Sequence, residues 1–333
     1  MPEGILAKIM AEMVVEKEKR LAEIWEKVKK EKMKEINLSE MYKQETVEVP
    51  LKTGTLLDSI IGGGLPSGKS MLIYGGFGSG KTQTCFTMCV ECPDHIVYID
   101  TEGSFRATRL KQICDARDKS FEEVIKKVHL YQPIEWIEQC MILPNLPSPA
   151  DIDGKIGLVI LDSISKRFRG IEFAGRQTLQ NKQPLVREST FDLERYVREV
   201  GAALIITTQI YESPSGNPFM PAWANERPVG GSSLEHQPDF VVHLRRAAGN
   251  VRIARLVDSS FTPLMERPFQ ITAKGIEDLP EAARKMVEQT EKFEKEQLQP
   301  WLKERKKKKG KEEDKDKEGD EEEPKEEEKE EQT

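Results

Sequence analysis

The chain has 333 residues, of which 37% are apolar, 33% charged and 7% aromatic. These proportions suit one medium-sized hydrophobic core with appendages, and they exclude a small disulfide-stapled protein and a collagen-like chain. The net charge of −7 is concentrated at one end, because residues 310–333 hold 5 Lys against 14 Asp or Glu, a net −9, and the preceding residues carry +2. The acidic average therefore belongs to the last segment and not to the core.

The cysteine count and the length of the apolar runs indicate the cellular compartment in which the protein is expected. Five cysteines is an odd and sparse number, which is typical of reduced thiols. The first residues do not form a basic segment followed by an apolar one, and no run reaches the length of about 18 apolar residues that spans a bilayer. We therefore expect a soluble, cytoplasmic protein without a membrane partner.

The first 40 residues are rich in Lys and Glu and carry apolar residues at helical spacing. Within residues 5–38 this spacing predicts a charged N-terminal helix. Two readings of its apolar stripe stay open: it packs on the chain's own domain, or it binds a partner or a second copy. Residues 47–68 then combine a short extended stretch, an apolar segment of helix size and a glycine-rich turn that leads into the core.

Seven apolar runs of strand length follow between residues 70 and 278. They begin at residues 71, 95, 156, 202, 240, 252 and 269. The first four are separated by helix-compatible stretches, and runs that are apolar throughout indicate strands buried on both faces. This pattern predicts an α/β core over residues 41–280 with a mostly parallel, doubly wound sheet. The closely spaced later strands predict antiparallel additions at one edge.

Beyond the core, the chain becomes strongly charged. Residues 281–309 predict a C-terminal helix that ends in a basic cluster, and residues 310–333 form the acidic tail. Blocks of like charge cannot bury enough apolar surface to offset chain entropy, so we expect the tail to be disordered.

The phosphate-binding pattern GxxxxGK[ST] occurs twice, at residues 63–70 and at residues 75–82. A P-loop follows a strand and opens a helix, because its backbone amides and the helix N-terminus must point together at the phosphates. Only the second match has this context, so we interpret the first as the turn that leads into the sheet. The predicted nucleotide-binding residues are Gly75, Gly76, Phe77, Gly78, Ser79, Gly80, Lys81, Thr82 and Gln83.

Within this P-loop, Lys81 is expected to reach the β- and γ-phosphate oxygens, and Thr82 to ligate Mg2+. The second protein contact of the magnesium should be a carboxylate at the end of an apolar strand, and Asp162 ends such a run. Glu102 follows another strand-like run and could accept a proton from the attacking water. ATP and Mg2+ are therefore the expected cofactors.

Several segments resemble, in sequence and spacing, those of the archaeal RadA family and its RecA-type relatives. They are GGFGSGKTQ, YIDTEGSFRATRL, LDSISKRFRG with AGRQTLQ, TTQI, RPVGGSSLEH, and ARLVDSS with TAKGIED. The likeness runs from about residue 51 to residue 278, roughly two thirds of the chain. It implies a RecA-like P-loop ATPase core that acts in homologous recombination and DNA repair.

The resemblance also implies roles for single residues. Glu102 would be the catalytic glutamate, Arg109 would pack on the adenine, and Gln209 would sense the γ-phosphate. His236 would lie near that phosphate.

The segments after Asp162 and after Gln209 match the two DNA-facing loops of the family. Cations that track a phosphate backbone, with aromatic rings that stack on bases, are what single-strand binding requires. Without the resemblance, the same charges would also suit a solvated face. The candidate contacts to single-stranded DNA are Lys166, Arg167, Arg169, Arg176, Lys182, Phe219, Trp223 and Arg227.

Other features depart from the family. The family carries an N-terminal helix-hairpin-helix domain that binds duplex DNA, where this chain has the charged helix. It also polymerises through a Phe-x-x-Ala hook before the core, whereas the first phenylalanine here is Phe77. Asp258 and Pro263 fall where the family caps ATP on a neighbouring protomer, but SSFTPLM differs from the family there. The second DNA loop is longer than the family's and rich in proline.

These departures predict an accessory paralogue of the main recombinase: a DNA-dependent ATP hydrolase whose protein partner is a RadA-type recombinase or a second copy. Two alternatives stay open. One is a full strand-exchange recombinase that forms filaments through another hook, and the other is a non-catalytic adaptor that uses nucleotide as a switch. A signalling ATPase of the same superfamily would not explain the matches in the DNA loops.

CxxxCxxC spacing relates Cys85, Cys89 and Cys92, and elsewhere it suggests an iron–sulfur cluster. Here the three lie on the predicted helix after the P-loop, whose apolar face should pack on the sheet, so we interpret them as small buried thiols. A structural role is also expected for the histidines in or beside strand-like runs, His95, His129 and His243.

Overall fold

The computed structural model describes residues 11, 12, 15, 18, 19, 21–23, 25, 26, 29, 37–47, 49–142, 146–170, 177–212, 225–287 and 289. Two compact units divide the chain, residues 1–49 and 50–333. The predicted acidic tail lies outside the described residues, and the predicted C-terminal helix is described as helical over residues 281–287. In the part of the chain that the structure describes, no helix is both long and apolar enough to cross a bilayer.

The first unit is helical wherever it is described between residues 11 and 29. It also contains α2 (Leu38–Val47), which crosses the expected boundary between residues 40 and 41. Two side chains of the predicted stripe, Leu21 and Trp25, are more than half exposed. The helical prediction is confirmed at the described positions, and the role of the stripe stays a prediction.

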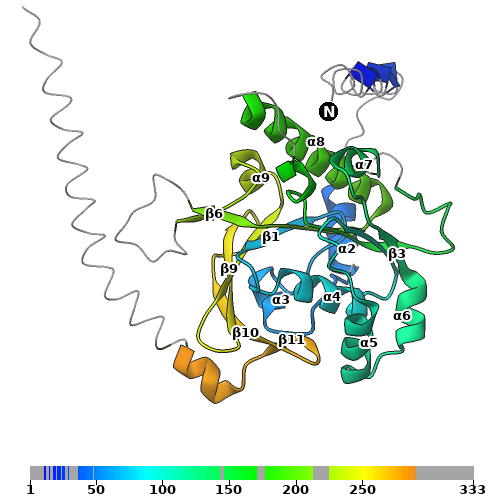
Figure 1. Cartoon of the computed structure of the whole chain (residues 1–333). Coiled ribbons are helices and arrows are strands. Elements are labelled where there is room, and N and C mark those ends of the chain that lie inside the picture. The colour runs from blue at the N-terminus through cyan, green and yellow to red at the C-terminus, as the bar shows by residue number, and fades with distance from the viewer. Residues whose placement is uncertain are drawn as a thin grey trace, which may run out of the picture. The chain divides into compact units, whose positions relative to one another are not determined.

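The second unit is built on a nine-stranded sheet with the order β11-β10-β9-β8-β1-β5-β4-β2-β3 (Figure 1). The neighbouring strands that run parallel are β8 (Phe240–Arg246), β1 (Ser70–Gly75), β5 (Ala203–Thr208), β4 (Ile156–Asp162), β2 (His95–Asp100) and β3 (Val128–Tyr131). Beyond β8 follow the antiparallel strands β9 (Val251–Ser259), β10 (Glu266–Thr272) and β11 (Gly275–Asp278). A separate hairpin joins β6 (Ile210–Glu212) to β7 (Glu226–Pro228).

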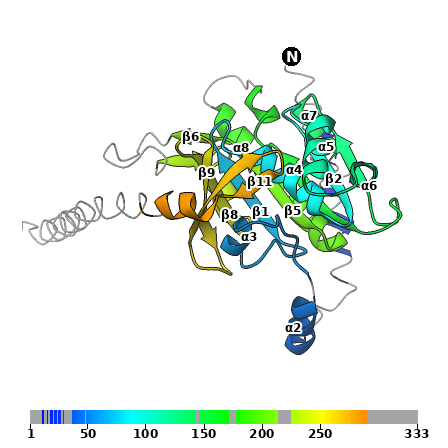
Figure 2. The ribbon, with the colours of Figure 1, turned by 90° about the horizontal axis from the view of Figure 1, so that it is seen from below.

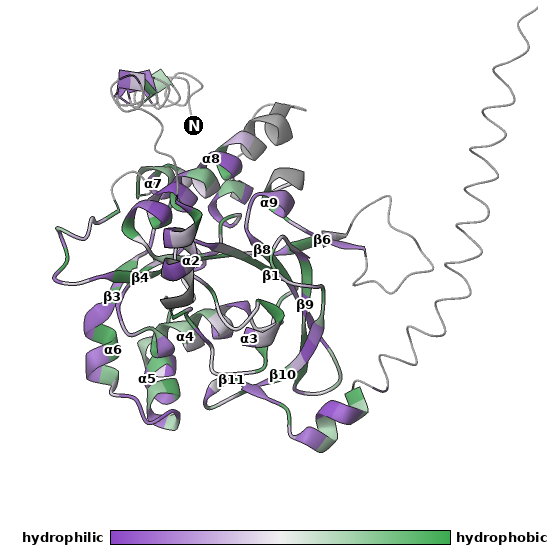
Figure 3. Cartoon of the chain, turned by 180° about the vertical axis from the view of Figure 1, so that it is seen from behind, coloured by the Kyte–Doolittle hydropathy of each residue, from purple (hydrophilic) through white to green (hydrophobic). Residues whose placement is uncertain are grey.

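Helices cover both faces of this sheet (Figures 1 and 2). One face carries α3 (Leu57–Ile60), α4 (Lys81–Glu91), α5 (Ala107–Ala116) and α6 (Phe121–Lys127). The other carries α7 (Trp136–Ile142), α8 (Gln177–Val200) and α9 (Ser232–His236), and a 3-10 turn, η2 (Arg167–Gly170), lies after β4. Because both faces are covered, β1 and β5 are buried along their whole length, which explains strands that are apolar throughout (Figure 3).

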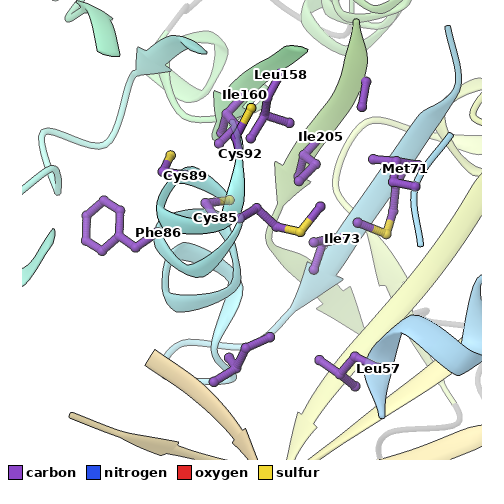
Figure 4. Close-up of a cluster of buried hydrophobic side chains, with 14 of the residues drawn as sticks. Leu57, Met71, Ile73, Cys85, Phe86, Cys89, Cys92, Leu158, Ile160 and Ile205 are labelled. Atoms are coloured by element: carbon purple, nitrogen blue, oxygen red, sulfur yellow. The ribbon is translucent and has the colours of Figure 1, made fainter. Parts of the chain in front are cut away.

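The main hydrophobic core lies between α4 and one face of the sheet (Figure 4). Cys85, Cys89 and Cys92 are buried there, with Cys92 beside Leu158 and Ile160. Burial raises the pKa of the Cys85 and Cys89 thiols well above the ordinary value, so both stay protonated. The prediction that these cysteines are small packing residues is confirmed.

The three histidines make contacts within the fold, as their structural interpretation requires. Nδ1 of His95 lies 3.1 Å from Nε2 of His129 across the β2–β3 pair. His243 is 3% exposed on its side chain, and its Nε2 lies 2.7 Å from Oε2 of Glu226. Its ring stacks on Tyr74, with ring centroids 4.7 Å apart.

All seven predicted strands are present, but the antiparallel orientation predicted for one of them was wrong. β9 and β10 are antiparallel as predicted, whereas β8 pairs parallel with β1. The reason is the long connection after β5, residues 209–239, which allows the chain to cross over the sheet before β8 begins. β3 and β11 were not predicted, because both are short and partly exposed and neither presents a continuous apolar run.

The turn between β10 and β11 requires glycine at position 275. Gly275 has a φ of +83°, and a Cβ there would lie 2.2 Å from Oγ1 of Thr87, a hydroxyl that already bonds the backbone of Gln83 and Ile276. We expect Gly275→Ala to lower the free energy of unfolding by about 2–4 kcal/mol, because backbone strain adds to a clash inside the core.

Urea unfolding of the variant and the wild type measures this difference. Gly249→Ala is the matched control, since Gly249 has a φ of +60° but a Cβ at that position would meet no atom within 4 Å. It should lose about 1 kcal/mol, the cost of strain alone. Equal losses in the two variants would show that the contact with Thr87 contributes nothing.

Candidate functional site

The second GxxxxGK[ST] match forms a P-loop between β1 and α4, and the first match does not. β1 ends at Gly75 and α4 begins at Lys81, so the loop amides and the first turn of α4 lie together. A Cβ at Gly75 would lie 2.1 Å from the carbonyl oxygen of Leu244 on β8, so only glycine fits. In the first match the N–H of Gly68 donates to the carbonyl of Ala202 at 2.7 Å, and the chain continues directly into β1. The interpretation of the first match as a turn into the sheet is confirmed.

Lys81 folds over the P-loop. Its Nζ donates to the carbonyl oxygen of Gly75 at 2.8 Å and to that of Gly76 at 3.1 Å. Burial lowers the pKa of Lys81, while nearby carboxylates oppose the shift. On the same loop, Oγ of Ser79 is buried and has no hydrogen-bond partner among the described residues. A buried hydroxyl without a partner, on the same loop as an ammonium that lies over its carbonyl oxygens, fits a phosphate group of ATP.

The remaining predicted loop residues lie on the same turn or at the start of α4. Phe77 is 91% exposed. Gly78 and Gly80 belong to the loop, and Thr82 and Gln83 lie in the first turn of α4.

Asp162 ends β4 and lies beside the first turn of α4. Its Oδ2 accepts a hydrogen bond from Oγ1 of Thr82 at 2.7 Å and one from the hydroxyl of Tyr98 at 3.2 Å. Its Oδ1 accepts one from Oγ1 of Thr207 at 2.5 Å. Burial raises the pKa of Asp162, and these three hydrogen bonds oppose the shift. A hydroxyl and a carboxylate in contact supply the oxygen ligands that Mg2+ prefers, so Thr82 and Asp162 fit the expected metal.

Replacing Asp162 with asparagine should raise the free energy of unfolding of the metal-free protein near neutral pH. Burial raises the folded-state pKa above that of the unfolded chain, so stability falls as the pH rises through the window between the two values. The amide keeps the shape of the carboxylate without its charge. Urea unfolding should show an advantage for the variant near neutral pH that shrinks as the pH falls toward the ordinary pKa of a carboxyl group. A variant less stable than the wild type at neutral and at acidic pH would contradict this prediction.

Glu102 lies in the loop after β2, and this loop is tied to the end of β4. The N–H of Thr101 donates to the carbonyl oxygen of Asp162 at 2.9 Å. The hydroxyl of Thr101 donates to the carbonyl oxygen of Ser163 at 2.5 Å and accepts from the N–H of Ser163 at 2.9 Å. These bonds hold Glu102 at the edge of the sheet that also carries the P-loop.

Two side chains contact the carboxylate of Glu102. Nζ of Lys166 lies 3.4 Å from its Oε2, and Nε2 of Gln209 donates to its Oε1 at 3.2 Å. Nη1 of Arg169 in turn donates to Oε1 of Gln209 at 3.0 Å. Gln209 follows β5, and Lys166 and Arg169 follow β4, so the ends of three adjacent strands bring these residues together. The sequence did not predict that cations of the first loop would reach Glu102 and Gln209.

Arg109 joins α5 to α4 and β10. Its Nε donates to Oε1 of Gln83 at 2.8 Å, and its Nη2 donates to the carbonyl oxygen of Thr272 at 2.6 Å. Nη1 also donates to Gln112. Burial lowers the pKa of Arg109, which stays charged. These hydrogen bonds therefore fix the guanidinium plane beside Gln83, which lies in the first turn of α4 directly after the P-loop.

His236, Asp258 and Pro263 lie apart from the P-loop of their own chain. Nδ1 of His236 is 3.7 Å from Oδ2 of Asp258, and Pro263 is exposed in the connection between β9 and β10. β8 meets β1 beside Gly75 near its carboxyl end and meets Asp258 near its amino end. About 10 Å of strand separates the two positions at 3.3 Å per residue. Within one chain, the three residues therefore lie toward the opposite end of β8 from the P-loop.

The predicted DNA contacts are described only in part. Lys166 is exposed directly before η2, Arg169 is exposed on η2, and Arg167 is half-buried between them. Arg227 is exposed on β7. Four predicted contacts have side chains outside the described part of the chain, namely Arg176, Lys182, Phe219 and Trp223.

Two further residues at the site, Asp100 and Arg252, were not predicted. Asp100 is buried and accepts hydrogen bonds from the N–H of Phe105 at 2.9 Å and from Nε2 of Gln132 at 2.9 Å, so it shapes the loop that carries Glu102. Its position at a strand end was a signal that could have found it. Arg252 donates to the carbonyl oxygen of Gly78 at 2.8 Å across 174 residues of sequence, and no local pattern points to it.

Comparison with known proteins agrees with this geometry. The profile of the Rad51 family matches residues 43–279. The DNA repair and recombination protein RadA of Metallosphaera sedula is 34% identical over 237 residues, which cover 68% of this chain and 71% of that protein. The DNA repair and recombination protein RadA of Aeropyrum pernix is 35% identical over 234 residues, which cover 67% of this chain and 70% of that protein.

The matched region holds the whole nine-stranded sheet and every strand end at which the P-loop, Asp162, Glu102 and Gln209 meet. Both the profile and the identity extend over about two thirds of the chain. The chain therefore belongs to the Rad51 family, with a RecA-like α/β core and a role in DNA recombination and repair.

Proposed function

We propose that this chain hydrolyses ATP, binds single-stranded DNA and assists a main recombinase as an accessory paralogue. One observation carries the proposal: Lys81, Asp162 and Glu102 meet at the carboxyl ends of the parallel strands of one sheet. Ligands of open α/β sheets bind at this edge. Both relatives are named as DNA repair and recombination proteins, which favours this function over other uses of a P-loop.

The phosphates are proposed to lie against the P-loop. Lys81 exchanges its bonds to the loop carbonyls for bonds to phosphate oxygens, and the hydroxyl of Ser79 donates to a phosphate as well. Thr82 and Asp162 would hold Mg2+, which neutralises charge on the β- and γ-phosphates when it is bound. The fixed guanidinium plane of Arg109 gives the adenine a surface on which to stack.

Glu102 is proposed as the general base. It accepts the proton that the attacking water loses as the oxygen of that water bonds to the γ-phosphorus and ADP leaves. Gln209 holds one carboxylate oxygen at 3.2 Å and so orients the carboxylate toward the P-loop edge. Because Gln209 follows β5 and Glu102 follows β2, both strands must be in register with β4 for this pair to form.

A second copy is proposed to complete the nucleotide site. Asp258, Pro263 and His236 lie toward the other end of β8 from the P-loop, and this placement favours contact with the nucleotide of a neighbouring copy. This arrangement supports self-association or association with a RadA-type recombinase. The absence of phenylalanine before Phe77 supports a hook other than Phe-x-x-Ala.

Single-stranded DNA is proposed to bind at the two loops after β4 and β5. Lys166, Arg167 and Arg169 supply the described cations of the first loop, and Arg227 lies at the base of the second. The predicted contacts Arg176, Lys182, Phe219 and Trp223 belong to the same proposal. The five cysteines, with no disulfide among the described ones, suit the cytoplasmic location that we also propose.

Steady-state ATP hydrolysis with and without single-stranded DNA, at low and high salt, tests the proposal. We expect turnover that DNA stimulates and that salt weakens, because phosphate contacts release counterions. No turnover under any condition, together with tight binding to another recombinase, would instead identify a nucleotide-switched adaptor. Strand exchange by the purified protein alone would identify a full recombinase.

A further inference from the structure

The first loop is connected to the catalytic carboxylate by a chain of side-chain contacts. Lys166 lies 3.4 Å from Glu102, Glu102 accepts from Gln209 at 3.2 Å, and Gln209 accepts from Arg169 at 3.0 Å. Lys166 and Arg169 stand on either side of Arg167 at the start of that loop. Two cations of the first loop therefore contact the two residues on which the proposed hydrolysis depends.

The contact between Lys166 and Glu102 opposes the proposed work of the glutamate. The ammonium of Lys166 occupies space on the carboxylate that an attacking water would need. The side chain of Glu102 is only 20% exposed, so few other groups can compete for it. That of Lys166 is 42% exposed, so its ammonium can move toward solvent or toward an outside anion.

A DNA backbone is an anion of the required kind. It presents closely spaced phosphates, and each phosphate oxygen is as good a partner for an ammonium as a carboxylate is. A strand that lies along η2 would attract Arg169 together with Lys166, since Arg169 is exposed on η2 and Lys166 is exposed directly before it. Binding would then withdraw Lys166 from Glu102.

We propose that Lys166 is a brake on hydrolysis: it pairs with Glu102 until the phosphate backbone of single-stranded DNA withdraws it. The inference rests on the proposed function, because it assumes that Glu102 is the base and that the first loop binds DNA. Lys166 is a positioning residue in this account and does not itself touch the reacting atoms. DNA stimulates turnover by releasing a carboxylate that the fold already holds in place.

The test is Lys166→Met, which keeps the length of the side chain and removes the charge. Turnover without DNA should rise about threefold, the scale of a half-exposed ion pair, with the KM for ATP unchanged. Turnover at saturating DNA should equal that of the wild type, because DNA has released Glu102 in both proteins. The stimulation by DNA should therefore fall by the same factor. An unchanged or lower turnover without DNA would overturn the proposal.

Salt gives a second, independent readout. Screening weakens a half-exposed ion pair, so DNA-free turnover of the wild type should rise with added salt relative to that of Lys166→Met. Lys166→Arg should behave as the wild type, since it keeps the positive charge. Parallel salt profiles for the wild type and Lys166→Met would overturn the proposal, because no charge pair would then limit the rate.

A matched control and one further variant separate the inference from the proposed function. Lys155→Met removes an exposed lysine from the other end of β4 and should leave DNA-free turnover and DNA stimulation unchanged. The double variant Lys166→Met with Glu102→Gln should turn over ATP no faster than Glu102→Gln alone. If Glu102→Gln alone keeps turnover, the assignment of the base fails; if it stops turnover and Lys166→Met does not raise it, only the brake fails.

Discussion

Lys81→Ala should lower ATP turnover by about 100- to 1,000-fold and weaken nucleotide binding, as expected when one preorganised donor to the phosphates is removed. Nζ of Lys81 sits over the loop within hydrogen-bond distance of the carbonyl oxygens of Gly75 and Gly76, so the side chain is already positioned by the fold. Its removal also takes the positive charge of the P-loop away from the carboxylates of Asp162 and Glu102. Steady-state hydrolysis and binding of a fluorescent ATP analogue measure the two effects.

The chain offers a matched control in its own sequence. Lys69 occupies the same place in the first GxxxxGK[ST] match, but it lies in the turn before β1 and pairs with Asp239 at 3.3 Å. Lys69→Ala should keep wild-type turnover and lose at most about 1 kcal/mol of stability, as is usual for a partly exposed ion pair. Loss of turnover in Lys69→Ala with retention in Lys81→Ala would reverse the choice of phosphate site.

Glu102→Gln should keep ATP bound while turnover falls by about 100- to 10,000-fold, because only the proton acceptor is lost. The amide has the shape of the carboxylate, and its oxygen can still accept from Nε2 of Gln209. The loop should also stay in place, since Thr101 and Asp100 hold it through bonds that do not involve Glu102.

The two readouts of this variant must be measured on one preparation. ATP binding within about twofold of the wild type shows that the P-loop is intact, and turnover then reports on the base alone. Turnover within about fivefold of the wild type would remove Glu102 from the mechanism. The search would then turn to Asp100, the other carboxylate of this strand end, although its oxygens are engaged by Phe105 and Gln132.

The parallel part of the fold could be predicted because its strands are buried on both faces. β1 and β5 lie between α4 on one side and α8 on the other, and their runs are apolar without alternation. β3 lies at an edge and is half exposed, so four residues of mixed character carried no such signal. The orientation of β8 depended on the length of the preceding connection and not on the composition of the strand.

Some residues of the site could likewise be predicted from local sequence, whereas others depend on the tertiary structure. The P-loop, Asp162 and Glu102 could be found because each follows an apolar run, and the carboxyl ends of parallel strands share one edge. The contacts of Lys166 with Glu102 and of Arg252 with Gly78 could not be found, because they depend on how loops from separate strands fold over that edge. Sequence patterns identify which residues arrive at the edge, and only the folded structure identifies which of them touch.

The placement of Asp258 and His236 toward the far end of β8 from the P-loop affects how many complete nucleotide sites an assembly of copies contains. On the proposed assignment, a complete site exists only at a junction, so an open row of n copies holds n − 1 sites and one terminal copy is always idle. Activity per chain would then climb with protein concentration and level off as rows lengthen. In a short row, a large fraction of the chains would lack a complete site. A partner that binds the end of the row, or closure of the row into a ring, would change the number of complete sites without altering any catalytic group.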